Sequence, residues 1–444
     1  MKPSPIPAMH DAAAGRDAAG VLRFITAGSV DDGKSTLIGR LLYDSRAIMA
    51  DQLFALTRAK HKRAAVEHGD STIDLALLTD GLEAEREQGI TIDVAYRYFA
   101  TPKRKFIIAD SPGHEQYTRN MVTAASTADA AVILIDATRV IGGELLPQTR
   151  RHTAIAAMLG VRHLIVAVNK MDLVDCSQER FEAIRAAYLA FAAGLDRADI
   201  DFVPLSALAG DNVVVRSERM PWYDGLPLLS LLESLPDARC DSSTELRFPV
   251  QYVLRTGGDT ADDFRGYAGR VEAGRVSKGD TITILPAGDT AKVAAIHVFD
   301  RELDTAAAGD SVTLIFDRDI DIARGDTVVA PSSNARVTRH ITADLCWLDA
   351  EPLASQRKYL LRQTTRTVSA RVSAIESRLD IHTLENVAGG TGLAMNDIAR
   401  ARFVLGQPIV CDRFDDHAAT GTFVLIDAAT NQTAAAGMIR DVEA

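Results

Sequence analysis

The 444-residue sequence predicts an α/β domain followed by two small all-β barrel domains. Patterns of buried strands and amphipathic helices alternate up to about residue 235, whereas short β-rich runs separated by Gly-Asp turns fill the remainder. A chain of this length is also expected to form about three domains of ordinary size. We therefore assign residues 21–238 to the α/β domain, 245–331 to the first barrel (domain II) and 335–440 to the second (domain III).

The α/β domain is predicted to begin with a buried strand at residues 22–27 and a helix whose apolar face includes Leu37 and Leu41. Between them lies a glycine-rich turn with the spacing of a P-loop, in which backbone N–H groups and the helix N-terminus point at phosphate oxygens. Lys34 is expected to place a compact positive charge beside the terminal phosphates, and Ser35 to offer its hydroxyl to magnesium. The predicted phosphate-binding residues are Gly28, Ser29, Val30, Asp31, Asp32, Gly33, Lys34, Ser35 and Thr36, with Asp110 and Gly113 from a later segment.

That later segment and a polar loop supply the other residues expected at the phosphates. Asp110 ends the apolar run 106–109, where a carboxylate at the end of a parallel strand can bind magnesium, usually through water. Gly113 then provides a backbone N–H able to contact a third phosphate. Thr91 lies in a loop rich in glutamate; a lone threonine there is usually a solvated turn residue, but its place between the other motifs favours a metal ligand. The predicted metal ligands are Ser35, Thr91 and Asp110.

Two further segments predict which base is bound. A carboxylate at Asp172, after the apolar run 164–168, can accept the two N–H donors on one edge of guanine, which adenine lacks. The stem of Lys170 can lie across the base, and residues 206–208 can present backbone N–H groups to its carbonyl oxygen. Alone, the Asn-Lys-Met-Asp tetrapeptide is more typical of a helix cap or surface turn. In this ordered set it indicates an α/β P-loop GTPase domain that binds GTP and Mg²⁺. The predicted guanine-binding residues are Asn169, Lys170, Asp172, Ser206, Ala207 and Leu208.

The remainder of the chain is predicted to form strands. Gly-Asp pairs that begin at Gly279, Gly309 and Gly325 mark turns, and residues 331–334 are typical of a linker between the barrels. The strands expected in domain II cover residues 248–254, 267–271, 281–285 and 312–316. Those expected in domain III cover residues 343–348, 367–375, 399–405 and 423–426.

Composition and charge argue against several kinds of function. The formal net charge of −11 gives no support to a surface that binds nucleic acid, and the basic clusters 60–63 and 103–105 are expected on solvated faces. Residues 1–20 are expected to be a disordered tail rather than a signal peptide, and no stretch approaches the length of a membrane span. The four cysteines form no Cys-x-x-Cys pair, which favours reduced thiols in the cytoplasm and disfavours structural zinc.

A GTPase domain followed by two barrels resembles the translation elongation factor class of GTPases. Gly89-Ile90-Thr91, followed by the segment 110–114, is similar to that class in particular. The chain differs from the translation factors at Ser29 and Asp32, where they usually carry histidine. The segments that instead resemble the large, GTP-binding subunit of bacterial sulfate adenylyltransferase are residues 28–42, 80–89, 116–121, 264–269 and 427–431. This resemblance extends from about residue 21 to residue 439.

The resemblance implies a division of labour between two subunits. A separate small catalytic subunit binds ATP and sulfate and joins sulfate to the AMP part of ATP, which forms adenylyl sulfate and releases diphosphate. The subunit described by this sequence hydrolyses GTP, which can drive formation of the high-energy phosphoric-sulfuric anhydride. The implied assembly is a cytoplasmic heterodimer or higher heteromer in the first step of sulfate assimilation, without nucleic acid or membrane.

The resemblance also implies catalytic roles. His114 is expected to orient the attacking water, while Lys34 and Thr91 act on the phosphates and the metal. A histidine that caps the turn before the next helix is the alternative for His114. Two other functions stay open for the chain: a translation factor that acts on the ribosome or tRNA, and a GTP-dependent scaffold that does not hydrolyse GTP.

Overall fold

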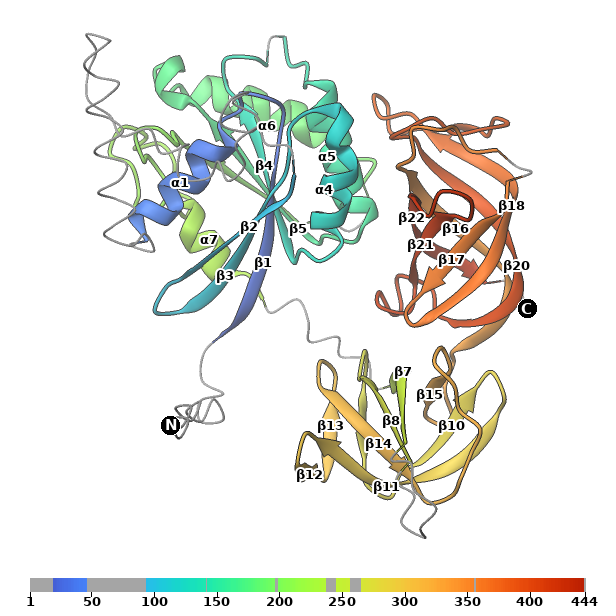
Figure 1. Ribbon diagram of the computed structural model, residues 1–444. Coiled ribbons are helices and arrows are strands. Elements are labelled where there is room, and N and C mark those ends of the chain that lie inside the picture. The colour runs from blue at the N-terminus through green and yellow to red at the C-terminus, as the bar shows by residue number, and fades with distance from the viewer. Residues whose placement is uncertain are drawn as a thin grey trace, which may run out of the picture.

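The computed structural model describes residues 19–45, 93–140, 142–195, 199–236, 245–255, 265–354 and 357–442. In these ranges the chain forms a six-stranded sheet with helices, followed by two barrels made of strands (Figure 1). The predicted fold class, an α/β domain followed by two all-β barrels, is therefore confirmed. No helix within these ranges has the length and apolar character needed to cross a bilayer. Thr91 and the basic cluster 60–63 lie outside the described residues.

The sheet of the α/β domain has the strand order β2-β3-β1-β4-β5-β6. Neighbouring strands are parallel, except that β2 runs antiparallel to β3 at the edge. Figure 1 shows helices on both faces, with α1 and α7 on one side and α4 and α5 on the other. The strands are β1 (Ala19–Ala27), β2 (Ala95–Ala100), β3 (Arg104–Asp110), β4 (Ala130–Asp136), β5 (His163–Asn169) and β6 (Asp199–Pro204). The helices are α1 (Lys34–Asp44), α4 (Thr118–Ala125), α5 (Pro147–Met158), α6 (Gln178–Ala192) and α7 (Leu228–Ser234), with short 3₁₀ helices η2 (Glu115–Tyr117) and η3 (Met171–Val174).

The central strands of this sheet are buried because helices cover both of its faces. All seven residues of β4 are buried, and the strand is a continuous apolar run that ends in Asp136. The second halves of β3 and β5 are also apolar and largely buried, and the two strands end in Asp110 and Asn169. The carboxyl ends of three strands therefore bring polar side chains to one edge of the sheet, the edge at which ligands bind in folds of this kind.

The first strand begins earlier than predicted. Ala19 and Gly20 belong to β1 and not to the expected tail, and Ala19 lies opposite Arg104 of β3. Arg104 is buried, and its guanidinium donates to the carbonyl oxygens of Gly20 and Leu235. The expectation that the whole cluster 103–105 lies on a solvated face is therefore wrong for Arg104, because two carbonyl acceptors replace its water.

Domain II is a barrel of six strands, β10-β15-β7-β8-β14-β11, which closes where β10 pairs with β11. β12 extends the sheet beside β11, and β13 pairs with β9. The strands are β7 (Arg247–Arg255), β8 (Arg265–Arg270), β9 (Arg275–Ser277), β10 (Thr281–Leu285), β11 (Asp289–Val298), β12 (Arg301–Leu303), β13 (Thr305–Ala307), β14 (Ser311–Phe316) and β15 (Thr327–Val329).

The three predicted Gly-Asp turns of domain II share one geometry. Gly279, Gly309 and Gly325 have φ angles of 90°, 98° and 98°, in the left-handed region that glycine adopts without steric cost. The aspartate after each glycine accepts a hydrogen bond from the backbone N–H three residues before it, at 2.8 to 2.9 Å. The carboxylate closes the turn and the glycine permits its conformation, which explains why the pair recurs.

Domain III is a second barrel of six strands, β17-β21-β22-β16-β20-β18, closed by pairing of β17 with β18. Its core includes Trp347, Tyr359 and Phe403, which are almost fully buried. The strands are β16 (Arg336–Trp347), β17 (Tyr359–Gln363), β18 (Arg366–Leu379), β19 (Asn386–Ala388), β20 (Ile398–Cys411), β21 (Thr422–Asp427) and β22 (Thr433–Val442).

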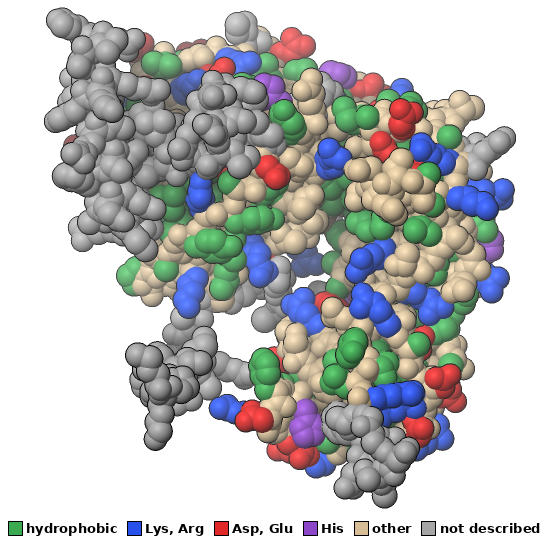
Figure 2. All heavy atoms as spheres, in the orientation of Figure 1, with side chains coloured by type: hydrophobic (Ala, Val, Ile, Leu, Met, Phe, Trp, Pro, Cys, Tyr) green, Lys and Arg blue, Asp and Glu red, His purple; other side chains and the backbone are tan. Residues whose placement is uncertain are grey.

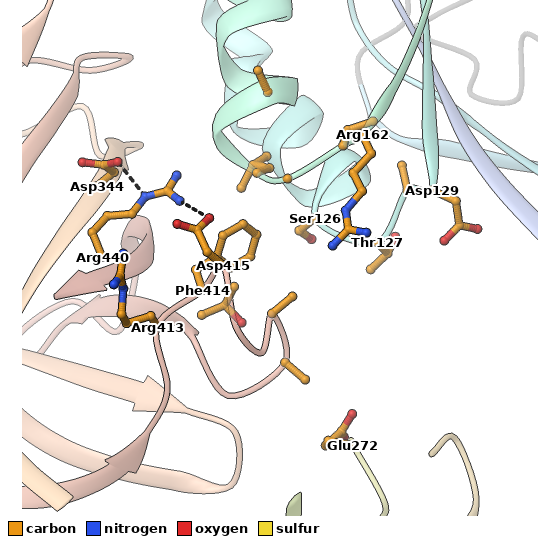
Figure 3. A pocket seen from close by; sticks show the side chains of 18 of the residues that line it. Ser126, Thr127, Asp129, Arg162, Glu272, Asp344, Arg413, Phe414, Asp415 and Arg440 are labelled. Carbon is orange, nitrogen blue, oxygen red and sulfur yellow. Dashed lines mark hydrogen bonds and ion pairs between the residues drawn. The ribbon is translucent and has the colours of Figure 1, made fainter. Parts of the chain in front are cut away.

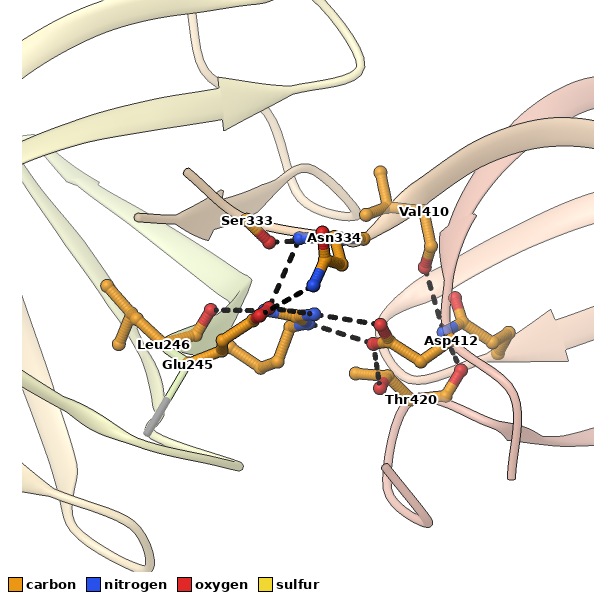
Figure 4. A network of polar contacts seen from close by, with 10 residues as sticks. Glu245, Leu246, Ser333, Asn334, Val410, Asp412 and Thr420 are labelled. Atoms are coloured by element: carbon orange, nitrogen blue, oxygen red, sulfur yellow. Dashed lines mark hydrogen bonds and ion pairs between the residues drawn. The ribbon is translucent and has the colours of Figure 1, made fainter. Parts of the chain in front are cut away.

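A buried polar network joins domains II and III (Figure 4). The guanidinium of Arg247, which is fully buried, donates to both carboxylate oxygens of Asp412 at 2.8 Å and to Glu245 at 3.0 Å. Thr420 also donates to Asp412. Asn334 donates to Glu245 from its backbone and its side chain. The segment expected to be a linker therefore contacts domain II directly.

Domain III also packs against the α/β domain. Cys346, Ile398 and Met438 belong to the same apolar cluster as the core of the α/β domain. Phe414 lies so close to Gly160 that a Cβ added to the glycine would be 2.5 Å from its ring. These contacts place domain III beside the C-terminal end of α5.

A cleft of about 1320 Å³ remains where the three domains meet, and Figure 2 shows Lys and Arg side chains around its opening. Three arginines on its domain III wall, Arg400, Arg402 and Arg440, are paired with carboxylates. Arg440 contacts Asp344 at 2.8 Å and Asp415 at 3.0 Å (Figure 3), and Arg400 also contacts Asp344, at 2.7 Å. This wall of the cleft therefore carries balanced charge and differs from the phosphate site predicted in the α/β domain.

Candidate functional site

The P-loop connects β1 to α1, as predicted. Gly28 and Gly33 have φ angles of 155° and 93°, and a Cβ added to Gly33 would lie 2.4 Å from Asn169 Nδ2. A larger residue at position 33 would therefore push Asn169 away. Helix α1 begins at Lys34 without a side-chain cap, so the backbone N–H groups of its first turn face the loop.

Lys34 is buried inside this loop. Its ammonium donates to the carbonyl oxygens of Gly28 (3.0 Å) and Ser29 (2.7 Å). Burial lowers the pKa of Lys34, while the nearby carboxylates of Asp32, Asp110 and Asp31 act in the opposite direction. The geometry thus concentrates one cation and several backbone donors in one small space, a donor set that suits phosphate oxygens.

Asp32 is a residue of the P-loop, and its side chain is fully buried. Its Oδ2 accepts the Ser29 N–H at 2.6 Å, its backbone oxygen accepts from Asn169 at 2.8 Å, and Arg139 lies 3.6 Å from its Oδ1. Burial raises the pKa of Asp32 to about 6 although Lys34 opposes the shift. Within the part of the chain that the structure describes, the Ser29 hydroxyl has no hydrogen-bond partner, which fits a loop that takes up a polar ligand.

Asp110, at the end of β3, is buried and fixed in place by Thr26, whose hydroxyl donates to Oδ1 at 3.2 Å. Ser35 is half-buried in the first turn of α1, next to Lys34. A carboxylate and a hydroxyl beside a phosphate loop are ligands that Mg²⁺ accepts. The residues present therefore fit a magnesium ion, with Thr91 outside the described residues.

Gly113 brings the segment after β3 against the P-loop. A Cβ added to it would lie 2.6 Å from Lys34 Nζ and 3.0 Å from the backbone of Ser29 and Val30. Only glycine fits this approach. His114 is the next residue, half-buried, with its ring 6.3 Å from that of Tyr117 in an edge-on arrangement.

The segments predicted to bind guanine meet at the same edge of the sheet. Asn169 bridges them, since its Nδ2 donates to Asp32 of the P-loop (2.8 Å) and its Oδ1 accepts from Ala207 N–H (2.9 Å). Lys170 has a left-handed φ of 61° and forms an ion pair with Asp136 at 2.7 Å. Asp172 is half-buried in η3. The backbone N–H groups of residues 206–208 are predicted to contact guanine, and that of Ala207 is already engaged by Asn169.

Comparison with known proteins identifies the family. Residues 20–239 match the elongation factor Tu GTP binding domain, residues 267–329 match elongation factor Tu domain 2, and residues 340–440 match the GTP-eEF1A C-terminal domain-like family. Sulfate adenylyltransferase subunit 1 of Tolumonas auensis is 50% identical over 94% of this chain and 86% of that protein, and the protein of the same name from Laribacter hongkongensis is 52% identical over 95% and 86%. The chain belongs to the sulfate adenylyltransferase subunit 1 family.

A longer enzyme and a solved structure also match the chain. The bifunctional enzyme CysN/CysC of Mycobacterium tuberculosis is 49% identical over 96% of this chain and 68% of its own length. Among solved structures, sup35 complexed with GMPPNP aligns over 96% of this chain with 24% identity and a TM-score of 0.43. In this member of the sulfate adenylyltransferase subunit 1 family, the match of residues 20–239 to the elongation factor Tu GTP binding domain implies a site for GTP.

Sequence analysis missed several residues that shape the site in this sulfate adenylyltransferase subunit 1 family member. His152 of α5 accepts the Gly28 N–H, Arg139 contacts the P-loop, and Arg40 of α1 donates to the backbone oxygens of Ala207 and Leu208. His152 is buried in α5 together with Thr149, Thr153 and several alanines, so it is only a weak signal in the sequence. Nothing in the sequence marks Arg139 or Arg40 as site residues, because arginines are common on the surfaces of loops and helices.

Proposed function

We propose that the chain is the GTPase subunit of a heteromeric sulfate adenylyltransferase, in which GTP hydrolysis drives synthesis of adenylyl sulfate and diphosphate from ATP and sulfate. The observation that carries the proposal is the identity of 50% and 52% with relatives named sulfate adenylyltransferase subunit 1 over nearly the whole chain. The nucleotide-binding edge of the sheet supports it, because P-loop, Asp110 and Asn169 lie together there.

The chain's own residues suit phosphoryl transfer, which depends mainly on positioning and charge. Lys34 and the P-loop N–H groups would bind the phosphates, with Ser35, Asp110 and Thr91 as ligands of Mg²⁺. When bound, Mg²⁺ would neutralise charge on the phosphate oxygens. His114 would orient the attacking water, which is supported by its place directly after Gly113, the residue that contacts Lys34 and the P-loop.

The proposed partner is a small subunit that binds ATP and sulfate and performs adenylyl transfer. The relatives' printed name, subunit 1, supports a partner of some kind. We place the assembly in the cytoplasm. The three cysteines in the described part of the chain, Cys176, Cys346 and Cys411, are buried free thiols, in agreement with a reducing compartment.

A translation factor is the second candidate, because all three domains match families named after elongation factors. It is less supported, since the relatives of about 50% identity carry the sulfate adenylyltransferase name. Hydrolysis stimulated by ribosomes, and not by ATP with sulfate, would favour it.

The experiment is phosphate release from GTP by the purified chain with its small partner, with and without ATP and sulfate, while adenylyl sulfate is measured. We expect slow hydrolysis by the chain alone and faster hydrolysis in the complex when both substrates are present, with adenylyl sulfate beyond the amount that ATP alone supports. Lys34→Gln should abolish both effects, whereas Lys105→Gln, at an exposed lysine of the same domain, should not. Equal GTP turnover alone and in the complex would count against the proposal.

A further inference from the structure

Arg139 lies on the turn after β4 and reaches the P-loop from the side. Its backbone N–H donates to the carbonyl oxygen of Asp136 at 3.1 Å, and the Asp136 carboxylate is fixed by Thr138 and by Lys170. From this turn the guanidinium donates to the carbonyl oxygen of Val30 at 2.6 Å and lies 3.6 Å from Asp32 Oδ1. Arg139 thus contacts two P-loop residues from a turn that is anchored at the guanine-binding segment.

Asp32 needs a positive charge nearby. Its side chain is fully buried, and Oδ1 accepts no hydrogen bond from the residues that the structure describes. Its pKa, raised by burial to about 6, leaves the carboxylate mostly ionised at neutral pH. A buried negative charge therefore lies within the loop proposed to bind phosphate, where it would repel phosphate oxygens unless it is neutralised.

Two cations, Lys34 and Arg139, lie near Asp32, and they differ in their other interactions. Lys34 is the P-loop lysine, and any attraction to Asp32 competes with its attraction to phosphate. The Arg139 side chain is 41% exposed and its guanidinium is already bonded to Val30, so it can neutralise Asp32 without leaving its place. The planar guanidinium can interact with the Val30 carbonyl oxygen and the Asp32 carboxylate at once. A lysine ammonium is less suited to this geometry.

We propose that Arg139 is a positioning residue of the GTP site: as the counter-ion of Asp32, it fixes the P-loop and leaves Lys34 available for phosphate. This inference rests on the proposed function and deepens it. Arg139 acts through Asp32 and Val30, and not on the reacting atoms. Because a triphosphate carries more negative charge than a diphosphate, binding of GTP depends on this compensation more strongly than binding of GDP.

The test compares Arg139→Gln, Asp32→Asn and the double variant, each made in the full chain and measured without the small subunit. The measured quantity is the Kd for fluorescent analogues of GTP and GDP. Arg139→Gln should raise the Kd for the GTP analogue about tenfold and that for the GDP analogue less. Adding Asp32→Asn to Arg139→Gln should restore most of the affinity, since asparagine still accepts the Ser29 N–H but carries no charge. Arg139→Lys should keep most of the affinity.

The matched control is Arg162→Gln, at an exposed arginine of the same domain, which should bind GTP like the wild type. The inference is overturned if Arg139→Gln binds the GTP analogue like Arg162→Gln, or if the double variant binds no better than Arg139→Gln. If Arg139→Gln does not fold, the double variant decides, because loss of the carboxylate should restore both folding and binding. A wild-type chain that binds no GTP would instead refute the proposed function, and the sulfate-dependent reaction plays no part in this test.

Discussion

Among single residues, His152 demonstrates how the P-loop depends on a side chain that is distant in the sequence. Its ring is fully buried in α5, and Nδ1 accepts the Gly28 N–H at 3.1 Å. An imidazole that accepts at Nδ1 is neutral, and burial lowers the pKa of His152 to about 3. Nδ1 of His152 therefore acts as a fixed acceptor for the first glycine of the loop, while the ring proton lies on Nε2, which is 2.8 Å from Gln148.

This histidine predicts a loss of stability in acid. The unfolded chain binds a proton on His152 below its ordinary pKa of about 6.5, whereas the folded chain does not until about pH 3, so the free energy of unfolding falls as pH falls through this window. The contribution at about pH 5 is about 2 kcal/mol. His152→Gln, which can still accept from Gly28, should lose less stability between pH 7 and pH 5 than the wild type, as measured by urea unfolding.

Asp32 acts in the opposite direction, because its raised pKa makes the folded state the better proton acceptor between about pH 3.8 and pH 6. That contribution is the same in both proteins and cancels in the comparison. An identical pH dependence of the wild type and His152→Gln would contradict the prediction.

Asp172 predicts a change of base preference. Xanthine has a carbonyl group where guanine has an amino group, so an amide at position 172 can donate to xanthine but cannot accept both guanine donors. Asp172→Asn should weaken binding of GTP by about 100-fold or more and make XTP the better ligand. Competition binding measures both effects. Asp175→Asn, at an exposed aspartate in the same loop, is the control and should leave the preference for GTP unchanged.

At the scale of elements, the Gly-Asp turns of domain II allow a test of backbone conformation alone. Nothing lies within 4 Å of a Cβ added to Gly279, so Gly279→Ala meets no steric contact and is disfavoured only by its φ of 90°. It should lower the free energy of unfolding by about 1 kcal/mol. Gly390→Ala, at an exposed glycine without a left-handed φ, should have a smaller effect. Thermal unfolding of both variants checks this, and equal shifts would contradict it.

The strands differ in how well the sequence predicts them. The strand predicted at 281–285 coincides with β10, because strong alternation and a Gly-Asp turn define it on one side. β16, β18 and β20 extend well beyond their predicted runs, to 12, 14 and 14 residues. The outer parts of β16 and β18 carry polar residues on both faces, and that of β20 contains Gly406 and Pro408, so cross-strand pairing, which depends on distant residues, defines their ends.

The residues of the site also differ in how well the sequence predicts them. Residues of the contiguous motifs, such as Lys34, Asp110 and Asn169, are recognisable because each motif is local and their order is specific. Arg139 and His152 contact the P-loop across more than 100 positions of sequence. Such contacts are fixed by the packing of α5 and of the turn after β4 on the sheet, which single-sequence patterns do not encode.

For the whole molecule, the polar network between domains II and III determines whether the barrels behave as one body. Arg247 of domain II and Asp412 of domain III are both buried and paired through two hydrogen bonds of 2.8 Å. Two buried charges in this geometry bind strongly only in one relative orientation of the domains. The network therefore favours movement of the two barrels together.

Removal of Arg247 should separate the barrels. Arg247→Met leaves the Asp412 carboxylate buried without its cation and should cost about 3–5 kcal/mol. Lys278→Met, which removes an exposed pair with Glu302, is the control and should change stability little. Urea unfolding measures the loss, and hydrogen exchange should rise around Asn334 and Thr420 in Arg247→Met alone. Unfolding of Arg247→Met like Lys278→Met would contradict the prediction.

Strand β22 has a consequence for synthesis on the ribosome. It pairs with both β16 and β21, and its residue Met438 belongs to the apolar cluster shared with the α/β domain. Barrel closure in domain III, and its packing beside α5, must therefore wait until residues 433–442 have left the exit tunnel. The α/β domain is complete long before then and exposes the apolar surface around Met158 and Leu159 to the cell. During translation this surface is open to aggregation until domain III covers it.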